Sequence, residues 1–233
     1  MKPLIAIVTC HRYKDRADAQ RATWIKVLDK KMDYKFFLGE GGGREPAADE
    51  VFLTVPDDYK SLPMKVRAVM QWALEHNYDA VLKVDDDVYI MPERLTTPRT
   101  QWEGRVNMSD KQLCPRGWCS GFAYWLSGSA LKMVASGELS EHPSEDVWIG
   151  RLLNKMGMKP EMQEGFIVLS FVNSKLWSHY RERVVASCEF AGGKMYEIHY
   201  ALRSNTPIEI KVPRNTRGFK VMRYGDALRR RVR

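Results

Sequence analysis

Cysteine is scarce in this chain, and long apolar runs are absent. The four cysteines are too few and too scattered for a disulfide scaffold, and no two of them have the C-x-x-C spacing typical of a zinc site. No apolar run approaches the ~20 residues that a membrane-spanning helix needs. The run from Leu4 to Val8 is also too short for the core of a signal peptide. We therefore expect a cytoplasmic protein whose thiols are reduced.

Most of the chain carries no excess of positive or negative charge. The net charge is +8, yet ten residues from Arg203 to Arg233 are basic and two are acidic, so the remaining residues sum to zero. We expect one domain over residues 1–202 and a basic segment over residues 203–233. The segment favours a polyanionic partner (nucleic acid, an anionic membrane or a charged glycan), with Arg229, Arg230 and Arg231 as candidate contacts. The alternative is a solvated tail that only improves solubility.

The composition otherwise indicates an ordinary globular protein. Hydrophobic residues make up 44% of the 233 residues and charged residues 28%, which excludes a disordered, collagen-like or coiled-coil chain. Strand and helix patterns alternate over the first ninety residues, so we predict an α/β fold with a mostly parallel, doubly wound sheet and helices on both faces. Ligands of such sheets bind beyond the carboxyl ends of the strands. The expected strands span residues 4–8, 34–38, 51–55 and 80–84, and the expected helices residues 16–28 and 62–75.

The second half of the chain is less regular. Residues 96–118 are polar and predict irregular structure, and residues 122–126 form a short aromatic segment. A helix is expected from Ser144, its N-cap, to Met156, with Gly157 at its C-cap. Residues 167–171 and 195–199 look like late strands.

Three consecutive aspartates, Asp85, Asp86 and Asp87, follow the apolar strand that ends at Val84. Adjacent carboxylates repel one another, which destabilises the fold unless a cation neutralises them. Strand geometry places Asp85 and Asp87 on one side and Asp86 on the other. Paired carboxylates of this kind suit Mg²⁺ or Mn²⁺, and a substrate phosphate commonly fills the open positions of such an ion. The alternative interpretation is a solvated acidic turn.

A second acidic site lies at the start of the helix that begins after Ser144. We expect Asp146 to act as a general base, kept ionised by the helix N-terminus. The competing explanation is that acids in a first helical turn are favoured by the helix dipole alone.

Several sequence blocks, in this order, resemble glycosyltransferase family 31, the β-1,3-galactosyl- and N-acetylglucosaminyltransferases and Fringe. They include an R-x-T-W block, an F-x-L-G strand, a K-x-D-D-D segment, a C-S-G segment and an E-D-V segment. Together they cover about residues 4–199. The blocks are Arg21–Trp24, Phe36–Gly39, Asp58–Lys65, Leu82–Val88, Cys114–Tyr124, Glu145–Gly150 and Met156–Pro160.

The resemblance implies a GT-A fold, a UDP-sugar donor, a divalent metal (Mn²⁺ or Mg²⁺) and inversion at the anomeric carbon. It implies that Asp85 and Asp87 hold the metal and the donor diphosphate, and that Asp146 deprotonates the acceptor hydroxyl. A late histidine often completes the family's metal site; His199 fits best here and His179 second. Asp86, Arg21 and Lys65 would contact the donor, and Trp118, Gly121, Tyr124, Glu145 and Trp148 the acceptor.

The acceptor stays open at this point. One candidate is DNA that carries a hydroxymethylated pyrimidine, as in viral DNA modification, with tail arginines on phosphates and tryptophans around an extruded base. Core packing is the alternative role for those tryptophans. The second candidate is a bacterial or viral surface glycan. Two other classes also remain: a non-catalytic nucleic-acid- or lipid-binding module on a transferase scaffold, and a nucleotide-sugar hydrolase.

Overall fold

A seven-stranded mixed sheet forms the centre of the protein, as the computed structural model shows for residues 1–30, 32–139, 142–168, 182–188, 190 and 192–204. The strand order is β3-β2-β1-β4-β7-β6-β8. Neighbouring strands are parallel except that β7 runs antiparallel to both β4 and β6. The expected mostly parallel α/β sheet is confirmed. The strands are β1 (Pro3–Val8), β2 (Asp33–Leu38), β3 (Glu50–Phe52), β4 (Ala80–Asp85), β6 (Trp102–Asn107), β7 (Trp118–Ser127) and β8 (Glu161–Met162).

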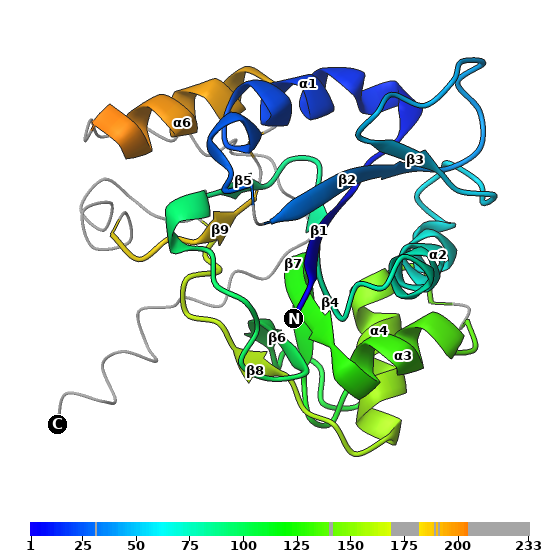
Figure 1. The fold of residues 1–233 in the computed structure, drawn as a ribbon. Coiled ribbons are helices and arrows are strands. Elements are labelled where there is room, and N and C mark those ends of the chain that lie inside the picture. Colours follow the sequence, from blue (N-terminus) through cyan, green and yellow to red (C-terminus); the bar gives the residue numbers. More distant parts are fainter. Residues whose placement is uncertain (31, 140–141, 169–181, 189, 191, 205–233) are drawn as a thin grey trace, which may run out of the picture.

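Helices cover both faces of this sheet (Figure 1). Alternate side chains of the central strand β1 point to opposite faces, and every residue of the strand is buried. Ile5 and Ile7 belong to the core beneath α1 (Lys14–Ala22) and α6 (Gly193–Ser204). Leu4 and Ala6 belong to the core on the other face. That second face is covered by α2 (Leu62–Glu75), α3 (Gly128–Ser136) and α4 (Glu145–Lys155).

A second sheet pairs β5 (Tyr89–Ile90) with β9 (Ala186–Ser187) in antiparallel orientation. It follows the three aspartates directly, because β5 begins two residues after Asp87. Three short 3₁₀ helices, η1 (His11–Tyr13), η2 (Ile25–Val27) and η3 (Pro92–Arg94), lie in the connections. Among the described residues, no helix is long and apolar enough to cross a bilayer.

Several expected elements differ from the structure. The first helix ends at Ala22, where the Thr23 hydroxyl donates to the Ala19 carbonyl, and a 3₁₀ turn follows instead of a continuous helix to residue 28. Residues 195–199 are helical, because their apolar positions recur at the helical spacing and pack with α1. Residues 102–107, expected to be irregular, form β6, and the segment at 122–126 is the centre of the longer β7.

Two further expectations fall at the edge of the described chain. Residues 167 and 168 have no regular structure, and residues 169–171 lie outside the described range. The boundary expected between residues 202 and 203 falls inside α6, which ends at Ser204.

Candidate active site

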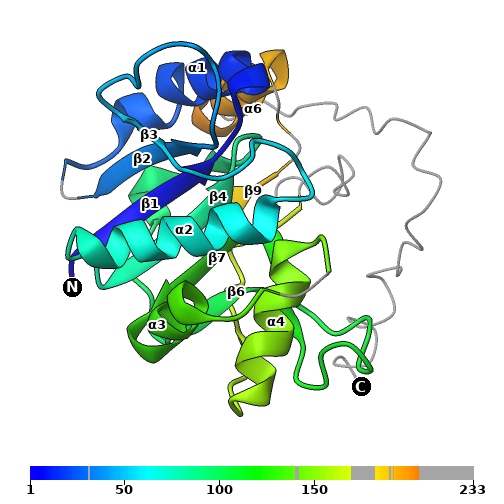
Figure 2. The same cartoon turned by 90° about the vertical axis from the view of Figure 1, so that its right-hand side faces the viewer.

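The acidic residues gather at one edge of the main sheet. Asp85 is the last residue of β4, and the parallel strand β1 ends beside it, with Val8 opposite Asp85. Because β7 is antiparallel to β4, its beginning lies at the same edge, and α4 starts there with Glu145 and Asp146. Figure 2 shows α4 next to the sheet at β7, the strand that it contacts. This is the edge where α/β sheets bind their ligands.

Lys83 is fully buried beneath this edge. Its ammonium donates to the Gly121 carbonyl at 2.6 Å, to Glu145 Oε1 at 2.8 Å and to Asp85 Oδ1. Burial alone would lower the pKa of Lys83, but the Asp85 and Glu145 carboxylates raise it, so the side chain stays charged. One ammonium therefore joins β4, β7 and α4. The sequence analysis selected neither Lys83 as a site residue nor Glu145 as its ion-pair partner. A lysine two residues before Asp85, on the same side of an apolar strand, was the signal.

Asp85 stays partly accessible, with 37% of its side chain exposed. Burial raises the pKa of Asp85; the Lys83 ammonium opposes this shift, and the Glu145 and Asp87 carboxylates add to it. Asp87 is also half-buried. Two further carboxyl groups therefore act on Asp85 at this edge.

Asp86 points to the other side and is buried. It accepts hydrogen bonds from the Thr9 hydroxyl and from Arg16 Nη1, both at 2.8 Å. Asp86 lies in the turn after β4, and its side chain connects Thr9, which follows β1, with Arg16 of α1. Arg16, which the sequence analysis did not select, is the α1 arginine nearest the acids; the Asp86 and Asp87 charges both raise its pKa, against its partial burial.

Asp146 lies in the first turn of α4 and is half-buried. Its Oδ2 accepts from the Gly121 N–H at 3.0 Å and its Oδ1 from the Val147 N–H at 2.8 Å. Desolvation and the neighbouring Glu145 carboxylate raise the pKa of Asp146 to about 6, in spite of the two N–H donors and Lys83. The carboxyl is therefore ionised at neutral pH yet close to the pKa that suits a general base.

Gly121 lies between these groups. A Cβ on this residue would meet Glu145 Oε1 at 2.9 Å and Asp146 Cβ at 3.5 Å. The close approach of β7 to α4 therefore requires a residue without a side chain. Gly121 contacts Lys83 through its carbonyl and Asp146 through its N–H, and its expected contact with the acceptor stays a prediction.

Lys65 reaches the same edge from α2. Its buried ammonium donates to the Thr9 carbonyl at 2.9 Å and to Asp57 Oδ1. Asp57 also accepts the N–H groups of His11 and Gly39, each at 2.7 Å. Against the effect of burial, these donors lower the pKa of Asp57. The ion pair fixes the loops that follow β1 and β2, and Asp57 was not recognised from sequence.

Arg21 has carboxylate partners away from the acidic edge. Its guanidinium contacts Asp18, Asp49 and Glu50 at 2.8–3.1 Å and lies over the Phe36 ring. This network fastens α1 to β2 and the start of β3. The expected contact of Arg21 with the donor therefore has no support in this arrangement.

The aromatic residues expected at the acceptor belong to the core. Trp118 and Tyr124 of β7 and Trp148 of α4 are each at most 5% exposed and belong to the core on the face of the sheet that α2, α3 and α4 cover. Trp148 Nε1 donates to the Glu138 carbonyl at 2.9 Å. Core packing, the alternative role, is the one that the structure shows.

His199 is on α6, where its Nδ1 lies 2.8 Å from the Tyr89 hydroxyl. Burial and the nearby Arg203 lower the pKa of His199. Across the described part of the chain, no three His, Cys, Asp or Glu side chains converge as a preformed metal site, so His199 does not join Asp85 and Asp87. His179 and the cluster Arg229, Arg230 and Arg231 lie outside the described residues.

The side chains at the edge nevertheless fit a divalent cation by their chemistry. Asp85 and Asp87 offer carboxylate oxygens, the ligands that Mg²⁺ and Mn²⁺ prefer. Burial raises the pKa of Asp85, and the Glu145 and Asp87 carboxylates add to this effect. A cation at this place would stabilise the ionised form of these carboxyls.

Comparison with known proteins connects this site with sugar transfer. Residues 15–114 match the model of the galactosyltransferase family. No curated protein matches the chain. A solved structure, described as a glycosyltransferase involved in the glycosylation of the major capsid of PBCV-1, aligns with a TM-score of 0.47 and 10% identity, over 84% of this chain and 100% of that chain. Over residues 15–114 the chain resembles the galactosyltransferase family, and this match supports a glycosyltransferase.

Proposed function

We propose that this glycosyltransferase uses a UDP-sugar and a divalent metal, and inverts the anomeric carbon in a single displacement. The observation that carries the proposal is the position, at one sheet edge, of two groups: the carboxyls of Asp85 and Asp87, and the half-buried Asp146, whose carboxylate accepts two backbone N–H groups. The first suits a cation and a diphosphate, and the second suits proton abstraction. An inverting displacement needs these two functions and no covalent nucleophile.

Asp85 and Asp87 would hold Mn²⁺ or Mg²⁺. A bound ion of this kind stabilises negative charge that develops on a diphosphate leaving group. Lys83 keeps the Asp85 carboxylate in place through its hydrogen bond, and is itself held by Glu145 and the Gly121 carbonyl. Lys83 is therefore a positioning residue rather than a catalytic one.

Asp146 would act as the general base. One of its carboxylate oxygens accepts the proton of the acceptor hydroxyl, while that hydroxyl oxygen forms a bond to the anomeric carbon. The bond from this carbon to the diphosphate oxygen breaks on the opposite face, and UDP departs with the electron pair. The backbone N–H groups of Gly121 and Val147 orient the Asp146 carboxylate for this step.

The acceptor has two candidates. A hydroxymethylated pyrimidine in DNA is one candidate, because the segment from Arg203 to Arg233 carries the whole net charge of +8. A bacterial or viral surface glycan is the alternative. A non-catalytic binding module and a nucleotide-sugar hydrolase are the competing classes.

Release of UDP separates these possibilities. A panel of UDP-sugars is incubated with the protein, with and without Mn²⁺, in the presence of hydroxymethylated DNA, plain DNA or oligosaccharides, and products are identified by mass spectrometry. The proposal expects UDP release that needs both Mn²⁺ and one acceptor class. Release without any acceptor would indicate a hydrolase, and no release with any donor would favour the binding module.

A further inference from the structure

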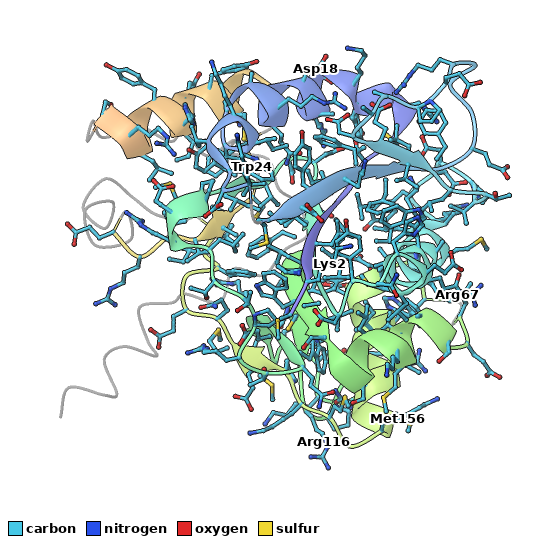
Figure 3. The ribbon with its side chains drawn as sticks, viewed as in Figure 1. Lys2, Asp18, Trp24, Arg67, Arg116 and Met156 are labelled. Carbon is cyan, nitrogen blue, oxygen red and sulfur yellow. The ribbon has the colours of Figure 1, made fainter. Side chains whose placement is uncertain are left out.

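A basic pocket lies along α4, apart from the acidic edge. Its volume is about 340 Å³. The loop that connects β6 to β7 forms one wall, and the second half of α4 forms the other. Figure 3 shows Arg116 close to the end of α4, where Met156 is labelled. The pocket is lined by Gln112, Leu113, Pro115, Arg116, Arg151, Asn154 and Lys155.

The cationic side chains of this pocket form no ion pair with an acid in the part of the chain that the structure describes. Arg151 is half-buried, and Arg116 and Lys155 are exposed. Within the described residues, no carboxylate oxygen lies within 4.0 Å of their side-chain nitrogens. Asp110, the acid nearest in the loop, uses Oδ1 to accept the N–H groups of Gln112 and Leu113 at 2.9 and 3.0 Å. Three positive charges in one cavity therefore favour an anionic ligand.

Hydrogen bonds hold the two walls of the pocket together. Asn154 Oδ1 accepts the Arg116 N–H at 2.7 Å, and Asn154 Nδ2 donates to the Gly117 carbonyl at 3.0 Å. One turn earlier on α4, Gly150 packs against Trp118 and Cys114, where a Cβ would meet Trp118 Cβ at 2.6 Å. The loop is thus fixed on the helix, and the pocket is a built feature of the surface.

The size and lining of the pocket narrow the class of ligand. Small-molecule sites have volumes of about 300–1,000 Å³, so this cavity suits a small unit rather than a broad surface. Guanidinium groups form bidentate hydrogen bonds with two oxygens of a phosphate. Leu113 and Pro115 add apolar contact for the group that carries the phosphate.

The pocket lies on the helix that also carries Asp146. Arg151 and Lys155 follow Asp146 by five and nine residues on this helix, which corresponds to about 7.5 and 13.5 Å along the axis and to about 140° and 180° around it. We propose that this pocket binds a phosphate group of an extended acceptor, which would pass around α4 to bring its hydroxyl to Asp146. The role as an acceptor site rests on the proposed function, whereas phosphate binding itself can be measured without turnover.

The test compares two triple variants that remove the same charge. The first is Arg116→Gln/Arg151→Gln/Lys155→Gln; the matched control, Lys26→Gln/Lys30→Gln/Lys132→Gln, changes three exposed lysines elsewhere. Binding of glucose 6-phosphate and of a short single-stranded DNA is measured by calorimetry on the full chain, with glucose as the uncharged probe. Thermal melting confirms that both variants are folded.

We expect at least one phosphate probe to bind the wild type and the control, and the pocket variant to bind it about tenfold or more weakly. Binding of the sugar phosphate points to a phosphorylated glycan as acceptor, and binding of the oligonucleotide points to a nucleic acid. If neither probe binds the wild type, or if both variants lose affinity equally, the inference is overturned. If the pocket variant keeps the wild-type kcat/KM on a phosphorylated acceptor, the pocket has no role in the reaction. If the wild type releases no UDP with any donor, the proposed function is wrong, but the phosphate site is unaffected by that result.

Discussion

Four neighbouring acids at one sheet edge have different surroundings and hence different uses. Asp86 is satisfied by Thr9 and Arg16, and Glu145 is buried on Lys83. Asp85 keeps 37% of its side chain exposed, and Asp146 faces the edge with its carboxylate held by two backbone N–H groups. Residue type alone would make all of them equivalent. Their hydrogen-bond partners and burial distinguish the structural acids from those available for chemistry.

Replacement of the base tests its assignment. Asp146→Asn keeps an oxygen for the Gly121 N–H but cannot accept a proton, so transfer should fall by about 10²–10⁴-fold. UDP affinity, measured by calorimetry, should stay within about twofold of wild type. Because burial raises the pKa of Asp146, its ionised form is disfavoured in the fold, and the variant should melt no lower than wild type at neutral pH. Equal loss of transfer and UDP binding would contradict the role as base.

The pH dependence of transfer follows from the same carboxyl. Asp146 must be ionised to accept a proton, and its pKa is raised from 3.8 to about 6. Activity should therefore be full above that pKa and decline as the pH falls through it. We expect a plot of kcat/KM against pH to show an acidic limb near pH 6 that is missing from the residual activity of Asp146→Asn. An acidic limb near the ordinary aspartate pKa would show that burial does not raise the pKa of Asp146.

The sequence could identify part of the candidate site. The sequence located the three aspartates at the end of a buried strand, where the structure has the last residue of β4 and the turn that follows it. It could not show that Trp118 and Trp148 are core residues, since burial depends on which helices cover the sheet. It also could not show that Arg21 is occupied by carboxylates from β3 and the residue before it. Those contacts join segments about thirty residues apart.

At the scale of elements, Lys83 is the connection between two strands and a helix. It lies on β4, and its ammonium contacts β7 through Gly121 and α4 through Glu145. The antiparallel pairing of β4 with β7 places the Gly121 carbonyl within its reach. The start of α4, and with it Asp146, is therefore positioned by a buried charge.

Removal of that charge should loosen the site. Lys83→Met leaves Glu145 buried without its counter-charge, so we expect the free energy of unfolding in urea to fall by about 3–5 kcal/mol. Addition of Glu145→Gln should recover part of the lost free energy of unfolding, because the double variant no longer buries an unpaired carboxylate. The coupling energy of the cycle should be about 0.5–3 kcal/mol. Additive effects of the two substitutions would contradict a direct role of the pair.

Elements with clear periodicity were predictable, and those set by packing were not. The helix at residues 62–75 was expected with the bounds that the structure shows, because its apolar residues recur at helical spacing and Pro63 occupies its first turn. Residues 195–199 were too short to distinguish a strand from a helix, and their packing on α1 decides in favour of α6. The strand β6 has a polar sequence that pairing with β7 stabilises.

At the scale of the whole molecule, charge is unevenly placed. The acidic edge and the basic pocket lie at different positions along α4, and the segment beyond residue 202 adds ten basic residues. If DNA is the acceptor, Arg229→Gln/Arg230→Gln/Arg231→Gln should reduce the slope of log affinity against log salt by about 2–3, as fewer counterions are released. Fluorescence anisotropy of labelled DNA measures this slope. An unchanged slope would exclude these arginines as phosphate contacts.

The central claim is that Asp85 and Asp87 bind a divalent cation together with the nucleotide of the donor. The most direct measurement is a crystal structure of the protein soaked with Mn²⁺ and UDP, with data collected at the manganese absorption edge. The account predicts an anomalous peak beside both carboxylates, in contact with the UDP diphosphate. Well-ordered Asp85 and Asp87 side chains with no peak beside them, or UDP bound at another part of the protein, would contradict it.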